Sequence, residues 1–359
     1  MTTPSRTRLP VPAGASPLAG LDAGLLRMGM PAPVSSQTLP DVHGPVMVLG
    51  FLGTLIGLER AVALRSGWAY AAPVLLGLGG LALVAPLPPL VGRVLLVYGT
   101  VALVAVLVAL WQRRRDDEVL VQALAAGLAA LAAVLWVRVE ASSVVPLLAG
   151  FVVLTIAAER VELARIHLPV NAGGVLVTMA TVYAVAATAA LVAPGPGSRA
   201  VGLTLLALVG WLAPRDVARH TVRSPGLPRF SATAMLGGYA WLAVAGVAWT
   251  VTGTPSEPGA YDVLVHTIFL GFAMSMVIAH APVILPAVIR RPLAYRPVLW
   301  LPLVVLHAGL ALRVAGDLAG ATTLARTGGV LTALALLLLP LTAGLSAAVP
   351  VRHPESIAP

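Results

Sequence analysis

The sequence contains no cysteine and no lysine, and only 10% of its 359 residues are charged. Without cysteine, disulfide bonds, iron–sulfur clusters and thiolate chemistry are excluded, so any metal must be held by His, Met, carboxylate or Tyr side chains. Without lysine, all 23 basic residues are arginine. With 58% hydrophobic residues, the chain carries too much apolar sequence for a soluble core and is predicted to lie in a membrane.

Apolar stretches of about twenty residues, long enough to cross a bilayer, recur along the whole chain. Eleven predicted spans lie between charged or proline-rich breaks, at 42–64, 68–91, 93–112, 118–137, 143–166, 169–193, 198–214, 230–252, 261–289, 297–318 and 322–349. A twelfth candidate, 17–34, is interrupted by Asp22 and Arg27. We therefore expect an all-α polytopic membrane protein of about 12 transmembrane helices. Its single transmembrane domain covers 17–350, between a disordered N-terminal tail (1–16) and a C-terminal tail (351–359).

The placement of arginine predicts the orientation in the membrane. One alternating set of connections carries most of the arginines, namely Arg60, Arg65, Arg113, Arg114, Arg115, Arg160, Arg165, Arg215, Arg219, Arg223, Arg229, Arg290, Arg291 and Arg296. We place this set in the cytoplasm, which also puts the C-terminus in the cytoplasm. The protein itself is predicted to lie in the cytoplasmic membrane of a bacterium. The net charge of +9 then reflects orientation and contact with anionic lipids of the bilayer, and not binding to nucleic acid.

An internal repeat is visible in three of the predicted helices. Segment 50–60, GFLGTLIGLER, is echoed by segment 150–160, GFVVLTIAAER, with the Glu-Arg pairs in register. A third echo, GFAMSMVIAH at 271–280, places His280 where the others have Glu59 and Glu159. This pattern predicts a pseudo-threefold repeat of four-helix units around a shared interior. The units would cover about 17–112, 118–214 and 230–349.

Histidines at matching positions are the main candidates for cofactor ligands. His43 and His266 each precede a Gly-Phe landmark near the outer surface, where two imidazoles at one depth can bind a heme iron or another metal from both sides. His280 and His307 are predicted to lie deeper, in the same layer as Glu59 and Glu159. We expect these four to form one polar cluster, with the histidines as further metal-ligand candidates.

Each candidate also has a structural alternative. His43 and His266 could cap helices, and His280 and His307 could form hydrogen bonds with neighbouring helices. The Glu59-Arg60 and Glu159-Arg160 pairs are expected to form interhelical ion pairs; a proton entry route or contacts to heme propionates are the alternatives. Arg313 could pair with a propionate or, more simply, with Asp317. Met47, Met274 and Met276 suit packing, although a thioether beside His43 or His266 could bind copper. The remaining histidines, His167, His220 and His353, are expected to be solvated.

Two segments carry a resemblance to a known family. His266-x4-Gly271 with Met276, Arg291-Pro292-Leu293 and the later segment 312–316, LRVAG, resemble the C-terminal part of the NnrS family of membrane proteins. Segment 43–51, HGPVMVLGF, resembles the start of that family's second helix. NnrS proteins are described as heme- and copper-containing, linked to nitric oxide stress, with twelve helices like those of the heme–copper oxidase catalytic subunit. The resemblance implies that His43 and His266 are axial heme ligands.

The chain also departs from that family. Val288-Ile289-Arg290 replaces the usual His-Thr-Gly before Arg-Pro-Leu, and the middle of the chain shows little similarity. With 17–34 counted as the first of twelve, helices six and seven (143–166 and 169–193) contain no histidine within the bilayer, so the three-histidine copper site of the oxidases is missing. Reduction of oxygen or nitric oxide by the oxidase mechanism is therefore not expected.

Two functions follow from these observations. The first is a heme-binding and copper-binding NnrS-like membrane protein, in which nitric oxide is the small gaseous ligand and the task is nitric oxide resistance or a related redox role. The second is a proton-coupled or anion transporter that uses its intramembrane Glu, Arg and His residues. The sequence names neither a substrate nor an electron-donor partner.

Overall fold

The computed structural model describes residues 20–22, 24, 26, 29, 39–289 and 295–348, with backbone alone for 283–289 and 347–348. Within these ranges every regular element is a helix, which confirms the all-α prediction. Both predicted tails, most of the candidate span 17–34, and the Arg291-Pro292-Leu293 motif lie outside the described residues.

Ten helical stretches in the described part are long and apolar enough to cross a membrane. They cover Leu39–Leu64, Gly67–Val84, Pro89–Arg114, Asp117–Trp136, Ala141–Leu163, Ala172–Val192, Leu227–Thr252, Pro258–Pro282, Pro297–Ala319 and Thr322–Ser346. The predicted span 198–214 overlaps a further helix, α9 (Pro194–Leu212), whose first six residues contain two prolines, two glycines and Arg199 and are therefore less apolar. The chain is thus a multi-pass membrane protein, while the count of twelve spans and the threefold repeat stay predictions.

One predicted boundary was wrong. The span 68–91 was expected to continue almost to the next one, but α4 (Ala71–Val84) ends seven residues earlier and α5 (Pro89–Arg114) begins before position 93. Pro86, Pro88 and Pro89 explain the shift, because proline cannot continue a helix and is favoured in its first turn.

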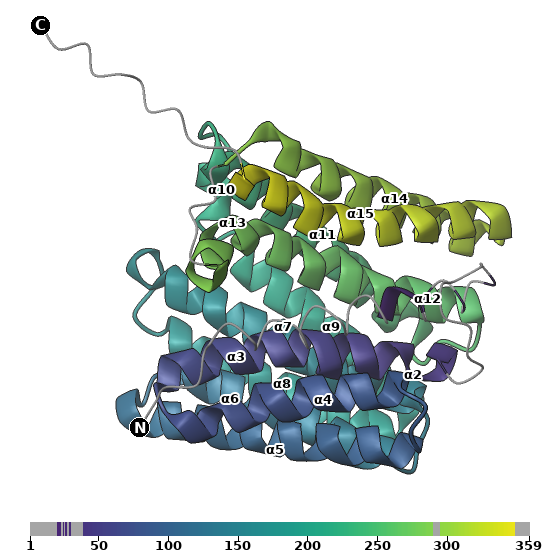
Figure 1. Cartoon of the computed structure of the whole chain (residues 1–359), viewed down its shortest axis with the longest axis horizontal. Helices are drawn as coiled ribbons and strands as arrows, with labels where there is room; N and C mark the ends of the chain where they lie inside the picture. Colours follow the sequence, from purple (N-terminus) through teal and green to yellow (C-terminus); the bar gives the residue numbers. More distant parts are fainter. Residues whose placement is uncertain are drawn as a thin grey trace, which may run out of the picture. The chain divides into compact units, whose positions relative to one another are not determined.

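The structure divides into two compact units, and the first contains residues up to Asp216 together with 243–265. Its consecutive helices pack as hairpins, α4 against α5, α5 against α6 and α6 against α7, seen in blue to teal in Figure 1. Large apolar side chains such as Val101, Val185 and Leu203 remain exposed on the outside, as expected of a surface that faces lipid. The elements not yet defined are α2 (Leu39–Pro45), η2 (Val46–Leu52), α3 (Gly53–Leu64), α6 (Asp117–Trp136), α7 (Val145–Leu163), η5 (Arg165–His167), α8 (Ala172–Val192) and α12 (Pro258–His266).

The second unit contains residues 217–242 and those from His266 onward. Its main feature is the hairpin of α14 (Trp300–Ala319) and α15 (Thr322–Ala348), which lie side by side in Figure 1. Gly320 closes helix α14 with φ +65°, a left-handed conformation that glycine adopts without strain. The other elements are α10 (Ala218–Thr221), the first part of α11 (Leu227–Thr252), η6 (Thr267–Met274), α13 (Ser275–Ile289) and η7 (Pro297–Leu299).

Two of the long membrane helices contain a π-helical stretch. η2 follows α2 in the first unit and η6 follows α12, and each contains one of the Gly-Phe landmarks. The third landmark, Gly150-Phe151, lies in the regular helix α7. Because π-helical turns are rare and occur frequently at functional sites, these stretches single out the helices that carry His43 and His266.

Candidate functional site

Arg60 on α3 joins two carboxylates in the first unit. Its Nη2 donates to Glu59 Oε1 at 2.6 Å and to Glu159 Oε1 on α7 at 2.9 Å. The Arg60 side chain is 10% exposed, Glu159 25% and Glu59 46%. This arrangement confirms the expected interhelical ion pair for Arg60, with the carboxylate supplied by the second Glu-Arg segment. One guanidinium therefore serves two acids.

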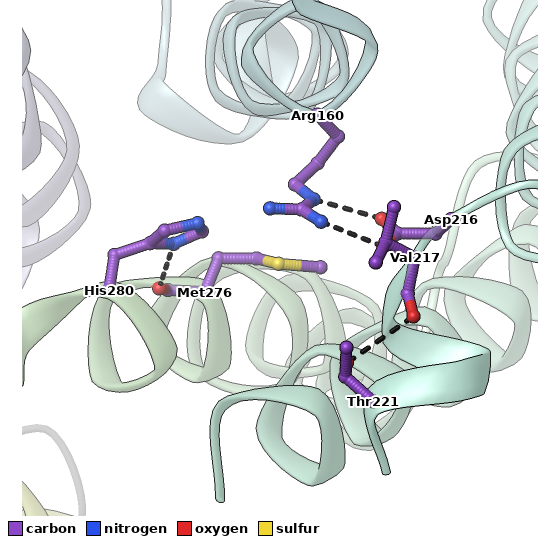
Figure 2. A network of polar contacts seen from close by, with 6 residues as sticks. All are labelled: Arg160, Asp216, Val217, Thr221, Met276 and His280. Atoms are coloured by element: carbon purple, nitrogen blue, oxygen red, sulfur yellow. Dashed lines mark hydrogen bonds and ion pairs between the residues drawn. The ribbon is translucent and has the colours of Figure 1, made fainter. Parts of the chain in front are cut away.

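Arg160, the next residue on α7, makes a separate ion pair. Its Nε and Nη2 donate to the two carboxylate oxygens of Asp216 at 2.9 and 2.7 Å, as Figure 2 shows. Both side chains are buried. Such a two-point contact is the strongest geometry available to an arginine and a carboxylate. The sequence reasoning assigned Arg160 to an ion pair but missed Asp216 as its partner. The available signal in the sequence was a single acidic residue, Asp216, shortly after the apolar helix α9.

The arginine-rich connections of the first unit meet at one end of its helices. Arg113 at the end of α5 donates to the Leu64 carbonyl at the end of α3, at 2.8 Å. Arg165, after α7, donates to Glu118 at the start of α6 at 2.8 Å. This hydrogen bond, together with one to Asp116, holds the pKa of the Arg165 guanidinium above its usual value. Within this unit the arginines predicted to share a side of the membrane therefore lie together.

His43 on α2 is held in a defined tautomer. Its Nδ1 lies 2.8 Å from the carbonyl oxygen of Gly20, which can only accept, so Nδ1 carries the hydrogen and Nε2 has the lone pair. A carbonyl that accepts from one imidazole nitrogen is the usual partner of a histidine whose other nitrogen binds a metal. A side chain at Gly24 would lie 3.1 Å from His43 Cε1, and one at Gly20 would collide with Met47. Two glycines thus allow close contact with His43 and Met47.

His280 on α13 has the same tautomer through a bond within its own helix. Its Nδ1 donates to the Met276 carbonyl one turn earlier at 2.7 Å, drawn in Figure 2. The lone pair of His280 is therefore on Nε2 as well. His280 belongs to the second unit, whereas Glu59 and Glu159 belong to the first. The predicted cluster of these acids with the deep histidines stays a prediction.

His307 on α14 has the opposite tautomer. The indole nitrogen of Trp241 on α11, which can only donate, lies 2.8 Å from His307 Nδ1, so the hydrogen of the neutral ring is on Nε2. Ser275 Oγ lies 3.4 Å from that nitrogen. The two rings are nearly parallel, at 11°, and a side chain at Gly237 would come within 2.7 Å of the imidazole. This geometry favours the hydrogen-bonding alternative for His307; its role as a metal ligand stays a prediction.

The other predicted ligands lie on separate elements. His266 is the residue immediately before η6, and Arg313 lies on α14, where its backbone closely approaches Gly328. His43 lies in the first unit and His266 in the second, so their pairing across a heme stays a prediction. Across the described residues, no group of three or more His, Asp or Glu side chains is placed to hold a metal ion.

The fold and these sites define an all-α, multi-pass membrane protein with buried arginine–carboxylate pairs and oriented histidines. Residues 6–348 match the family described as Domain of unknown function (DUF8744), and the chain belongs to that family. No curated protein and no solved structure matches the chain.

Proposed function

We propose that this protein binds heme in the membrane, with His43 and His266 as axial ligands, in the manner of the NnrS proteins that it resembles. The observation that carries the proposal is the environment of His43. Its Nδ1 donates to the Gly20 carbonyl at 2.8 Å, a contact that orients the ring as expected of a histidine that binds a metal through its other nitrogen. His266 precedes the second π-helical stretch as His43 precedes the first.

The residues around His43 fit such a ligand. An axial histidine needs a fixed ring and an apolar surrounding, and His43 lies beside Gly24 and is followed by the buried Val46 and Val48. Met47, one turn later, offers a thioether to copper as a second metal. Arg313 is the proposed partner of a heme propionate. When bound, the heme would supply an iron that takes up small gaseous ligands or transfers electrons.

The resemblance also supports a biological role. We infer that the protein acts in resistance to nitric oxide, or in a related redox task, as an electron carrier or ligand-binding protein. The three-histidine copper site of the oxidases has no counterpart in helices six and seven, so the proposal does not include oxygen reduction. The arginine-rich end of the helices is proposed to face the cytoplasm, which reporter fusions to the C-terminus would test.

The test is the visible spectrum of three variants purified from cells supplied with heme. His43→Ala and His266→Ala should each convert a low-spin heme spectrum to a high-spin one or abolish heme retention, because one axial ligand is removed. His167→Ala is the matched control, since this exposed histidine on η5 should leave the spectrum unchanged.

Retention of the wild-type spectrum by both single variants would reject the two histidines as ligands. A protein that carries no heme at all would favour the transporter alternative instead. That function is supported by the ion pairs that Arg60 and Arg160 make inside the first unit.

A further inference from the structure

The trio of Glu59, Arg60 and Glu159 has an unbalanced charge. A single nitrogen, Arg60 Nη2, donates to one oxygen of each carboxylate. With both acids ionised the trio has a net charge of −1, although Arg60 is buried and Glu159 is mostly covered. A buried charge without a partner is costly, and one bound proton makes this trio neutral.

We propose that Glu59 and Glu159 share one proton at neutral pH and form a proton-exchange site of the membrane domain. The gradient of exposure gives the site a direction. Glu59 is nearly half exposed and can exchange with solvent, while Glu159 lies further inside on α7. Because both acids contact one guanidinium, either carboxylate can hold the single proton of the proposed site. The inference does not depend on whether heme is bound.

Several charged side chains on the described helices around the trio already have partners of their own. The adjacent Arg160 is engaged by Asp216 through both carboxylate oxygens. On α5, Arg113 donates to a backbone carbonyl, and α4 contains no charged residue. At the start of α6, Glu118 is paired with Arg165. On α7 itself, Glu162 follows Glu159 and adds a further negative charge.

Polar groups without partners continue inward from the trio. Thr155 lies one turn before Glu159 on α7, is buried, and its Oγ1 has no hydrogen-bond partner among the described residues. Thr54 on α3, by contrast, donates to the carbonyl one turn back, at 2.6 Å. Gln122 on α6 is fully buried, and neither of its amide atoms has a partner in the described part of the chain.

Helix packing places Gln122 at about the height of Thr155. The Cβ position of Gly150 on α7 faces Leu128 on the antiparallel α6. On α6, Gln122 lies six residues before Leu128. On α7, which runs in the opposite direction, the residue six positions after Gly150 is the one that follows Thr155. Buried polar groups of this kind commonly hold a water molecule, which would extend hydrogen bonding inward from Glu159.

Infrared difference spectroscopy on the purified full-length protein tests the proposal. A protonated carboxyl group has a C=O stretching band that an ionised carboxylate lacks. The wild type should show such a band at neutral pH and lose it on alkalinisation. Glu159→Gln and Glu59→Gln should each abolish the band, because either change leaves Arg60 with one carboxylate and a neutral pair.

Of the two variants, Glu59→Gln distinguishes more clearly between a shared proton and a proton held by Glu159 alone. If Glu159 held its proton independently, Glu59→Gln would keep the band, and this result would overturn the shared site. A wild type with no carboxyl band at neutral pH would overturn it as well. Glu140→Gln is the control. Glu140 is exposed and lies in the connection between α6 and α7, so this substitution should leave the band intact.

Folding is checked separately. Both glutamine substitutions keep the size and shape of the side chain, and elution as a single species in detergent will show that the helices remain packed. Should one variant aggregate, the other still decides the question, because the proposal predicts the same loss of the band from either position.

Discussion

The two units of the molecule satisfy their buried polar side chains in different ways. In the first, Arg60 and Arg160 bind carboxylates that come from other parts of the chain. In the second, the described contacts around His307 are hydrogen bonds between neutral groups, from the Trp241 indole and with the Ser275 hydroxyl. At these two places, the contacts of Arg60 and Arg160 depend on charge balance, whereas those of His307 depend on the tautomer of its imidazole.

This difference predicts unequal sensitivity to substitution. Removal of one member of a buried ion pair leaves an uncompensated charge, whereas removal of a neutral donor leaves only an unsatisfied acceptor. Substitutions at Arg160, Trp241 and Arg165 test this difference.

The largest effect is expected from Arg160→Met. This change leaves Asp216, which is fully buried, without its two charge-assisted hydrogen bonds. Loss of one partner of a buried ion pair costs about 3–5 kcal/mol. Unfolding at increasing concentrations of a denaturing detergent would measure this loss of stability. The double variant Arg160→Met with Asp216→Leu should recover most of the loss, and failure to recover would show that the pair is not the cause.

A smaller effect is expected from Trp241→Phe. Phenylalanine keeps an aromatic ring beside His307 but removes the indole donor to Nδ1. The unsatisfied acceptor should cost about 1–3 kcal/mol in the same unfolding assay. Trp211→Phe is the control, because that side chain only stacks with Arg215. Equal losses in the two variants would contradict a specific role for the indole hydrogen bond.

The smallest effect is expected from Arg165→Gln. Its side chain is 56% exposed although it binds Glu118, and surface ion pairs contribute about 0–1 kcal/mol. Because the ion pair raises the pKa of a guanidinium that is already strongly basic, its contribution is present at neutral pH and is lost as the pH rises through that very alkaline pKa. Stability should therefore be flat across the neutral range in wild type and variant alike. A pronounced pH dependence removed by Arg165→Gln would be inconsistent with this assignment.

Much of the helix pattern could be predicted from the sequence, because apolar runs and arginine-rich breaks follow directly from the bilayer as solvent. The repeated Glu-Arg pairs also indicated ion pairs between helices, and Arg60 with Glu159 confirms this. Which carboxylate Arg160 contacts was not predictable, since Asp216 comes from a short connection whose path depends on tertiary packing.

Two further features had no periodic signal. The π-helical stretches η2 and η6 change the hydrogen-bond register without changing hydropathy, so apolar periodicity cannot reveal them. The contact of Trp241 with His307 joins residues on α11 and α14 that are distant in sequence. The His307 ring occupies the space beside Gly237, and the glycine alone does not indicate which side chain fills it.

The proposed binding of heme is tested by the visible absorption spectrum of the purified wild type together with its iron content. The account predicts a Soret band and about one bound iron per chain, as a single six-coordinate heme requires. A colourless, iron-free protein that is fully folded and was produced with heme in excess would contradict it.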